Sequence, residues 1–348
     1  MIYIDTPEKL NDLKLEGDIG LDIECENNLH HYGTYVATFQ ISTDKADILI
    51  DALRIRDIAP IKRVLEDPAR QKVMHGISFD LRILYTQYNM RLKNIFDTQI
   101  AAYLLGMPEV GLGIVLKKYF GIEKEEKFQK VDWTRRPLSP EMIEYAVKDS
   151  HYMLMLRDRM KKELQDKGRL QWAVQEFAAL ETTNVEYEEG GFWGLKGLTK
   201  MTESQRAILF RLYNLRDSLA KQVDRPIHFL IPNRVLVDLT LSTPSLTYWR
   251  SQRGVHPIVR AKADLFFREQ EKGRKERLDM PHRDVKKMTP RQKEEMEKLL
   301  EKRDMAAAKI GIQGFLILSK DQARDAVIAG NLDMLRPWQR EELQKVKG

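Results

Sequence analysis

The apolar positions of the first 51 residues form three short runs that predict neighbouring strands. The runs are 17–24, 35–42 and 46–51, each bounded by polar or glycine-containing segments. Their close spacing along the chain favours an antiparallel meander. Before them, Thr6-Pro7 has the pattern of an N-cap followed by proline at the first helical position, which predicts a short helix.

The pattern then changes to three- and four-residue spacing, interrupted by one short strand at 71–75. Helices are predicted over 58–65, 79–88, 100–105, 112–120 and 140 to about 164, the last being the longest. Strands alternating with helices indicate an α/β fold with a mixed sheet and helices around it.

After residue 200 the pattern is helical only. Residues 204–223 predict a strongly amphipathic helix, and prolines at 226, 232, 244 and 257 separate shorter ones, as in a small bundle. The densely charged stretch 268–309 is typical of an exposed helix or linker. We therefore divide the chain into an α/β domain (1–168), a bridging helix and linker (169–199), and two helical domains (200–275 and 286–348).

Composition limits the class of protein. The chain has 348 residues, 43% of them hydrophobic and 32% charged, which is typical of a globular protein. No apolar run approaches the roughly 20 residues that span a bilayer, and the N-terminus lacks the pattern of a secretory signal. The single cysteine excludes an internal disulfide and a thiolate zinc cage. We expect a cytoplasmic protein that does not associate with membranes.

The net charge of +6 is unevenly distributed. Residues 201–348 contain 30 Lys and Arg against 20 Asp and Glu, whereas residues 1–200 contain 28 against 32. An acidic first half and a basic second half fit a catalytic module joined to a module that binds a polyanion. The alternative is that the basic excess is ordinary solvated helix surface.

Acidic residues follow three of the predicted elements. Asp22 and Glu24 alternate on the first strand, so their side chains share one face, roughly 6–7 Å apart along the strand. Asp80 follows the strand at 71–75, where a helix N-cap is the simplest interpretation. Tyr145 and Asp149 lie four residues apart, on one face of the longest helix. Each feature alone also fits an ordinary structural role, and an exposed strand face would explain the first pair.

Taken together, the four carboxylates of Asp22, Glu24, Asp80 and Asp149 could bind two divalent cations in one cleft. Oxygen ligands favour Mg²⁺ or Mn²⁺ over zinc. Two such ions about 4 Å apart can activate a water and stabilise the leaving oxygen in the cleavage of a phosphodiester.

In chain order, the Asp22–Glu24 pair, Asp80 and the Tyr145–Asp149 pair resemble the ExoI, ExoII and ExoIII motifs of the DEDD 3′-5′ exonuclease superfamily, in its tyrosine-containing (DEDDy) branch. Within this superfamily, the chain is most similar to the ribonuclease D family. The likeness extends to further segments: Phe39-Gln40-Ile41, Phe96-Asp97-Thr98, Gln129 to Leu138, Trp193 to Gly197, Asp224-Arg225-Pro226 and Leu335 to Trp338. It implies an RNase H-like mixed-sheet exonuclease domain followed by an HRDC (helicase and RNase D C-terminal) domain and a second HRDC-like domain.

The resemblance also implies roles for single residues. Asp22, Glu24 and Asp149 would bind the first cation, Asp22 would bridge to the second, and Asp80 would hold the second largely through water. Tyr145 would orient the attacking water. The implied activity is a metal-dependent 3′-5′ exoribonuclease that releases 5′-mononucleotides, acts in the 3′ maturation of transfer RNA and other structured RNAs, and has no evident obligatory protein partner.

Two other functions stay open. A DNA exonuclease similar to the Werner-type nuclease would use the same acids, and matched RNA and DNA oligonucleotides would separate the two. A catalytically silent RNA-binding scaffold would not need four acids that together require a cation, and activity sensitive to a chelator would exclude it.

Overall fold

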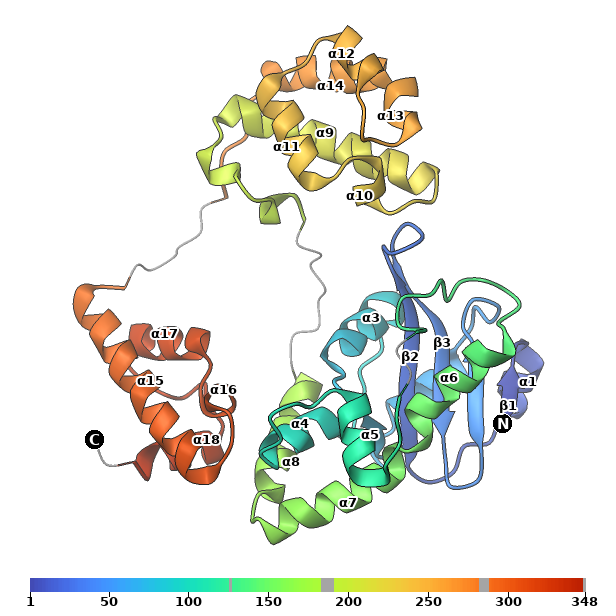
Figure 1. Cartoon of the computed structure of the whole chain (residues 1–348), viewed down its shortest axis with the longest axis vertical. Helices are drawn as coiled ribbons and strands as arrows, with labels where there is room; N and C mark the ends of the chain where they lie inside the picture. The colour runs from blue at the N-terminus through green and yellow to red at the C-terminus, as the bar shows by residue number, and fades with distance from the viewer. Residues whose placement is uncertain (125–126, 183–190, 282–287, 347–348) are drawn as a thin grey trace.

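The structure is a computed structural model that describes residues 1–124, 127–182, 191–281 and 288–346 (Figure 1). An α/β unit is followed along the chain by two groups of helices, which Figure 1 shows in yellow to orange and in red. The predicted fold class, a mixed-sheet α/β domain followed by helical domains, is confirmed.

The α/β unit is built on one six-stranded sheet with the order β1-β4-β3-β2-β5-β6. The predicted antiparallel meander is formed by β2, β3 and β4. The other three pairs are parallel: β1 pairs with β4, β5 with β2, and β6 with β5. The sequence pattern missed β6, because three residues are too short to show a two-residue period. The strands are β1 (Ile2–Ile4), β2 (Ile19–Asn27), β3 (Thr34–Ser42), β4 (Asp47–Asp51), β5 (Lys72–Met74) and β6 (Ile95–Asp97).

Helices cover both faces of this sheet. One face packs its apolar side chains, among them Ile19, Leu21 and Ile23 of β2, against α1, α2 and α3. α6 and α7 lie over the other face and contact β2. The helices are α1 (Pro7–Asp12), α2 (Ala59–Leu65), α3 (Ser78–Tyr88), α4 (Thr98–Leu104), α5 (Leu112–Phe120), α6 (Pro140–His151), α7 (Met153–Asp166) and α8 (Leu170–Thr182).

The single long helix predicted from residue 140 is wrong, because two helices, α6 and α7, meet at Tyr152. At this point the chain passes directly over Gly20 of β2. A Cβ atom on Gly20 would lie 2.5 Å from the Ser150 carbonyl oxygen and 2.9 Å from Met153 Cβ. The Ser150 hydroxyl also bonds that of Ser42 on β3, at 2.7 Å. The missing side chain of Gly20 therefore lets the last turn of α6 sit on the sheet.

The first helical group forms its own core around α9, the amphipathic helix predicted from residue 204. Thr202 and Gln205 form a capping box at the start of α9. The group contains α9 (Glu203–Gln222), α10 (Ile227–Leu230), α11 (Asn233–Ser242), α12 (Leu246–Ser251), α13 (Pro257–Ala261) and α14 (Ala263–Arg274), preceded by 3-10 turns at Phe192–Gly194 and Leu198–Lys200. Part of the linker predicted at 169–199 lies outside the described residues.

The second helical group shares an apolar core with the α/β unit. Trp338 stacks on Trp172 of α8 with ring centroids 4.8 Å apart, and its indole N–H donates to Glu176 at 2.8 Å. The group contains α15 (Pro290–Ile310), α16 (Gly314–Ile317), α17 (Lys320–Ala329) and α18 (Pro337–Gln344). Across the described residues, every helix is too short or too polar to cross a membrane.

The β2–β3 hairpin joins the α/β unit to the first helical group. The Tyr32 hydroxyl donates to Asp217 of α9 at 3.0 Å, and the Tyr32 ring packs against the core of that group. His31 Nδ1 lies 2.7 Å from Asp224 Oδ2. The first helical group thus contacts the hairpin that follows β2, the strand that bears Asp22 and Glu24.

Candidate active site

β2 presents Asp22 and Glu24 on the face opposite its apolar residues. Strand alternation places the two carboxylates on the side covered by α6. Asp22 stands opposite Gln40 of β3, and Glu24 stands opposite Thr38. The register then shifts so that Ala37 is an extra residue on β3, a bulge that ends the regular pairing directly beyond Glu24.

α6 supplies the next two predicted residues. Ser139 caps the helix by accepting the Met142 N–H, so the first turn begins at Pro140. Two residues before its end the helix projects Asp149 toward β2. Ligand oxygens of Asp22, Glu24 and Asp149 all lie within 4.8 Å of one another. The structure therefore brings together three of the four predicted acids, from a strand and a helix far apart in sequence.

Asp80 lies in the first turn of α3 and is not the N-cap, which is Ile77, so that interpretation was wrong. Asp97 organises this turn instead. Its two carboxylate oxygens accept the N–H groups of Gly76 and Ile77, each at 3.1 Å, and Oδ1 also accepts the Gln99 N–H at 2.7 Å. The sequence analysis did not place Asp97 in the site. The signal that could have marked it is an Asp-Thr pair before an apolar helical run, which is the pattern of an N-cap.

The four acids interact through their charges. Burial raises the pKa of Asp22 well above its ordinary value, and the charges of Asp149 and Asp80 add to the rise. Burial also raises the pKa of Glu24, with Asp22 as the next cause. The pKa of Asp80 is raised to about 7, by burial and then by Asp97. Asp80 lies outside the group of three, but its charge contributes to the raised pKa values of Asp22 and Glu24.

Buried carboxylates that repel one another require positive charge nearby. Part of it comes from Lys124, whose Nζ lies 2.7 Å from Asp149 Oδ1. Burial raises the pKa of Asp149, and Lys124 opposes that rise. The donor set consists of carboxylate oxygens alone, which fits hard divalent cations such as Mg²⁺ or Mn²⁺. Sequence reasoning missed Lys124, which belongs to no pattern that points to the site.

Tyr145 lies one turn before Asp149, with only 8% of its surface exposed. Its ring packs against Phe128 at 5.2 Å and Trp133 at 6.1 Å between centroids. Lys124 Nζ lies 5.2 Å from the ring centroid. The segment that leads into α6 thus forms the wall that holds the tyrosine in place.

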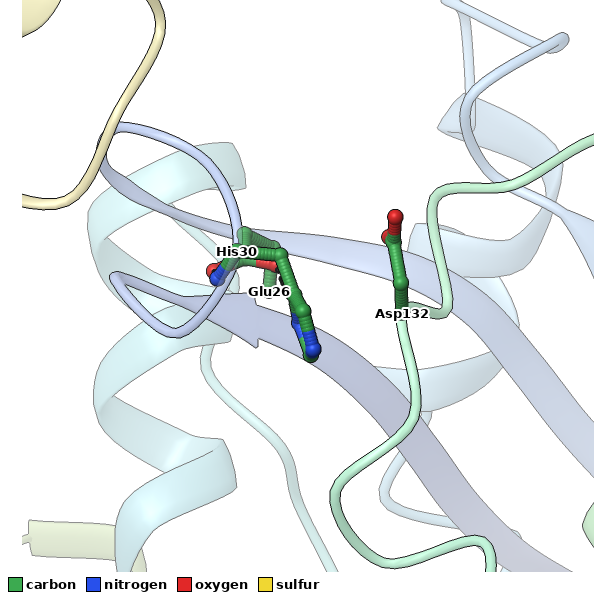
Figure 2. Close-up of side chains that lie close together, drawn as sticks. All are labelled: Glu26, His30 and Asp132. Carbon is green, nitrogen blue, oxygen red and sulfur yellow. Dashed lines mark hydrogen bonds and ion pairs between the residues drawn. The ribbon is translucent and has the colours of Figure 1, made fainter.

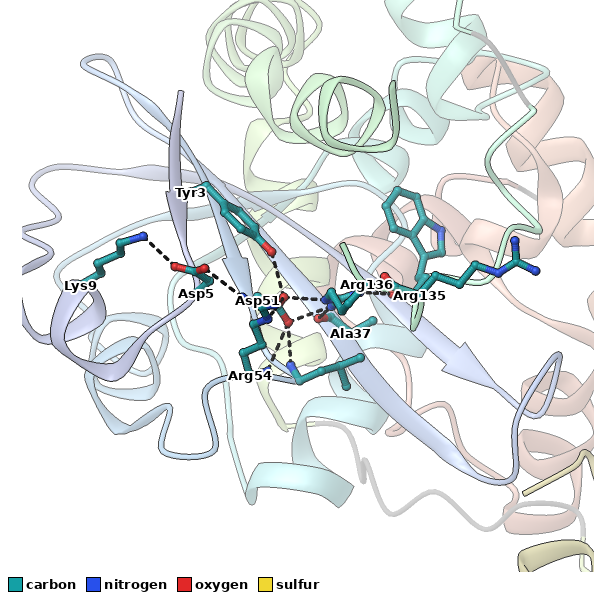
Figure 3. Close-up of polar contacts among 10 residues, drawn as sticks. Tyr3, Asp5, Lys9, Ala37, Asp51, Arg54, Arg135 and Arg136 are labelled. Atoms are coloured by element: carbon teal, nitrogen blue, oxygen red, sulfur yellow. Dashed lines mark hydrogen bonds and ion pairs between the residues drawn. The ribbon is translucent and has the colours of Figure 1, made fainter. Parts of the chain in front are cut away.

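A buried ion pair fixes this wall to the sheet (Figure 3). The guanidinium of Arg136 binds both oxygens of Asp51, at 2.5 and 2.8 Å, and donates to the carbonyl oxygen of Trp133 at 2.7 Å. Asp51 is fully buried and also accepts the Tyr3 hydroxyl at 2.9 Å. The Arg136 side chain thereby ties the loop before α6 to β4 and, through the Ala37 carbonyl, to β3.

A second group of possible ligands, Glu26, His30 and Asp132, lies at the hairpin end of β2 (Figure 2). These side chains have partners within the protein. Glu26 accepts the N–H groups of Leu29 and His30, and Asp132 accepts the N–H and hydroxyl of Thr134. Glu26 therefore acts as a cap of the hairpin, and Asp132 as a cap of the loop before α6.

The raised pKa values predict how stability depends on pH. A carboxyl with a pKa of about 7 in the folded protein and about 4 in the unfolded chain binds more protons when folded between those values. In the presence of EDTA, stability should therefore fall as pH rises from about 4 to about 7, and adding Mn²⁺ should raise the melting temperature more at pH 8 than at pH 5. Thermal unfolding at both pH values measures this. A metal effect equal at both would contradict the electrostatic account.

Known proteins resemble the chain along its whole length. The exosome complex exonuclease RRP6 of Saccharomyces cerevisiae is 29% identical over 266 residues, which cover 70% of this chain and 36% of that protein. The chain thus spans about a third of the length of this relative. Among solved structures, Escherichia coli RNase D matches with a TM-score of 0.75 at 22% identity over 99% of both chains. A protein from Bifidobacterium adolescentis matches with a TM-score of 0.83 at 20% identity, over 99% of this chain and 95% of the other.

The structural matches show that the chain has the fold of these proteins. Residues 1–165, which contain the four acids and Tyr145, match the family described as 3′-5′ exonuclease. This agrees with the resemblance found in the sequence motifs. The 3′-5′ exonuclease family model thus matches residues 1–165, just under half of the chain, and the structural matches show a shared fold over nearly all of it.

Proposed function

We propose that the chain is a metal-dependent 3′-5′ exoribonuclease that releases 5′-mononucleotides from RNA 3′ ends. The observation that carries the proposal is the convergence of Asp22, Glu24 and Asp149 within 4.8 Å, with Asp80 close enough to raise the pKa values of Asp22 and Glu24. Such a group is costly to bury, and two divalent cations would neutralise it.

The four acids would divide two cations between them. Asp22, Glu24 and Asp149 would hold one, Asp22 would be shared with the second, and Asp80 would hold the second largely through water. Bound Mg²⁺ or Mn²⁺ would lower the pKa of a water and stabilise the leaving oxygen. Asp22 is the central ligand in this arrangement, since both its burial and its two charged neighbours disfavour the ionised form unless a cation is present.

Tyr145 would orient the attacking water from the side of α6. Water would attack the phosphorus of the last phosphodiester, the bond from phosphorus to the O3′ of the preceding nucleotide would break, and the terminal nucleotide would leave with a 5′-phosphate. Phe128 and Trp133 hold the phenol ring in place. This packing supports a positioning role for the hydroxyl, because the ring has little freedom to turn away.

RNA is the substrate that the rest of the chain favours. The relative from S. cerevisiae is an exosome exonuclease, and the E. coli RNase D structure is described as an exoribonuclease involved in structured RNA processing. The basic residues of 201–348 would hold the body of the RNA, with 200–275 as an HRDC domain and 286–348 as a second HRDC-like domain. Precursors of transfer RNA are the substrates we propose, with no obligatory protein partner.

Degradation of matched oligonucleotides tests the proposal. A 5′-labelled RNA incubated with the protein and Mn²⁺ should give a ladder that shortens one nucleotide at a time from the 3′ end, and EDTA should stop it. A DNA strand of the same sequence should be degraded more slowly. Internal cuts would refute the exonuclease, and faster loss of DNA would favour the Werner-type alternative.

Tyr145→Phe should slow hydrolysis while leaving RNA affinity unchanged. The substitution removes only the hydroxyl, so the packing of the ring against Phe128 and Trp133 is kept, and positioned groups of this kind contribute roughly 10²-fold or more. Single-turnover rates with saturating RNA and a separate binding titration in Ca²⁺ measure the two effects. A variant that binds RNA poorly but cleaves it at the normal rate would assign Tyr145 to substrate binding.

A further inference from the structure

Lys124 is a basic residue inside a site made of acids. It lies between α5 and α6 and its side chain is only 17% exposed. Its ammonium lies 2.7 Å from Asp149 Oδ1 and also faces the ring of Tyr145. Among the residues that the structure describes, no other Lys or Arg forms an ion pair with any of the four acids. Lys124 is therefore the internal counter-charge of this site.

The charge of Lys124 reaches beyond Asp149. It lowers the pKa of Asp22 and of Glu24 as well, in each case against the larger raising effect of burial. One ammonium thus acts on all three carboxylates whose oxygens lie within 4.8 Å of one another. A divalent cation bound to the same oxygens would supply the same stabilisation with twice the charge.

The ammonium and a cation would compete for Asp149. A cation such as Mg²⁺ binds a carboxylate oxygen at roughly 2.0–2.1 Å. With the ammonium 2.7 Å from that oxygen, the two positive charges would lie within about 5 Å of each other in a partly buried site, where like charges repel more strongly than in water. Binding at Asp149 Oδ1 therefore requires the lysine to withdraw.

The surroundings of Lys124 allow this movement. A cavity of about 150 Å³ adjoins the site and is lined by Lys124 and neighbouring loop residues, by Leu116 of α5 and by several residues of α6. The base of the side chain is closely fitted, since a Cβ on Gly113 would lie 3.3 Å from Lys124 Cβ. The ammonium group of Lys124 can therefore move while its Cα and Cβ stay in place, because the side chain has four rotatable bonds.

We propose that Lys124 is a displaceable internal cation, which pairs with Asp149 when no divalent cation is bound there and releases it when one binds. The inference rests on the proposed two-cation site. Its consequence is that Lys124 weakens cation binding and keeps the buried acids from destabilising the protein when cations are scarce. Lys124 acts by pairing its charge with Asp149, and it is separate from the groups that would touch the substrate.

Calorimetric titration with Mn²⁺ alone tests the proposal. Lys124→Met keeps the length of the side chain and removes its charge, so it should bind Mn²⁺ about tenfold more tightly than the wild type, or ~1.4 kcal/mol. Lys148→Met is the matched control: Lys148 lines the same cavity but pairs with Glu144, at 2.7 Å, and its loss should leave the affinity near the wild-type value. Equal or weaker binding by Lys124→Met would overturn the proposal.

Thermal unfolding supplies a readout that does not depend on activity. In EDTA, Lys124→Met should melt below the wild type, and Mn²⁺ should raise its melting temperature by more. In an Asp149→Asn background the same substitution should have a smaller effect on both quantities, because the ion pair is already lost and only Asp22 and Glu24 still feel the ammonium. If Lys124→Met does not fold, Lys124→Gln carries the same test. Wild-type protein that binds no Mn²⁺ would refute the two-cation site itself, whereas wild-type binding without a gain in Lys124→Met would refute only the role of Lys124.

Discussion

Replacing Asp22 with asparagine is expected to lower the rate of RNA hydrolysis by roughly 10³-fold or more. Asp22 is the acid that both cations would share, and a bound cation contributes several kcal/mol to the transition state. Asparagine has nearly the same shape, so the fold should persist. Asp149→Asn should have an effect of similar size, because Asp149 completes the group of three. Single-turnover rates measured at saturating Mn²⁺ give both values.

The same two substitutions should stabilise the protein when cations are removed. Burial raises the pKa of Asp22 and of Asp149, so at pH 8 in EDTA each ionised carboxylate is unfavourable in the folded state. A neutral amide removes that cost, and the melting temperature should rise. Glu144→Gln, an exposed position on the same helix, is the control and should change neither rate nor stability. Normal hydrolysis by Asp22→Asn would contradict the two-cation assignment.

Arg136→Ala is expected to destabilise the protein by about 3–5 kcal/mol, the usual cost of removing one partner from a buried ion pair. Asp51 is fully buried, and Arg136 is the partner that binds both of its carboxylate oxygens. The loss also frees the Trp133 carbonyl and loosens the wall around Tyr145, so the hydrolysis rate should fall with RNA affinity largely kept. Urea unfolding measures the first effect, and single-turnover kinetics measures the second.

A double-mutant cycle separates the ion pair from general loss of packing. Asp51→Asn keeps an oxygen that can accept the Tyr3 hydroxyl and neighbouring N–H groups but removes the charge. The combination with Arg136→Ala should therefore cost less than the sum of the single changes, by about 1–3 kcal/mol. Additive effects would mean that the charges of Asp51 and Arg136 do not interact in the way Figure 3 indicates.

The sequence predicts the parts of the site that depend on the two-residue repeat of a strand or on the three- to four-residue spacing of a helix face. Strand alternation alone placed Asp22 and Glu24 on one face, and helical spacing placed Tyr145 and Asp149 together. In the structure Asp22, Glu24 and Asp149 converge, and Tyr145 and Asp149 line the same cavity. The meander of β2, β3 and β4 followed from the same reasoning, because each strand is long enough to show its pattern.

The sequence does not predict features that depend on tertiary contact. The break between α6 and α7 arises where the chain meets Gly20, more than 100 residues earlier. Lys124 enters the site from a loop with no periodicity of its own, and its ion pair with Asp149 exists only after α5 and α6 pack. Asp97 is an N-cap by pattern, but its bonds to the N–H groups before α3 depend on the pairing of β5 with β6.

The number of Mn²⁺ ions bound per chain is the measurement that tests the central claim most directly. Wild-type protein titrated with Mn²⁺ in a calorimeter, or followed by the paramagnetic resonance of free Mn²⁺, should bind two ions, with proton release as the raised pKa values of the acids require. Asp22→Asn should lose both sites or retain at most one of them weakly. Two ions bound with unchanged affinity in Asp22→Asn, or none bound in the wild type, would contradict the assignment of these carboxylates as a shared metal site.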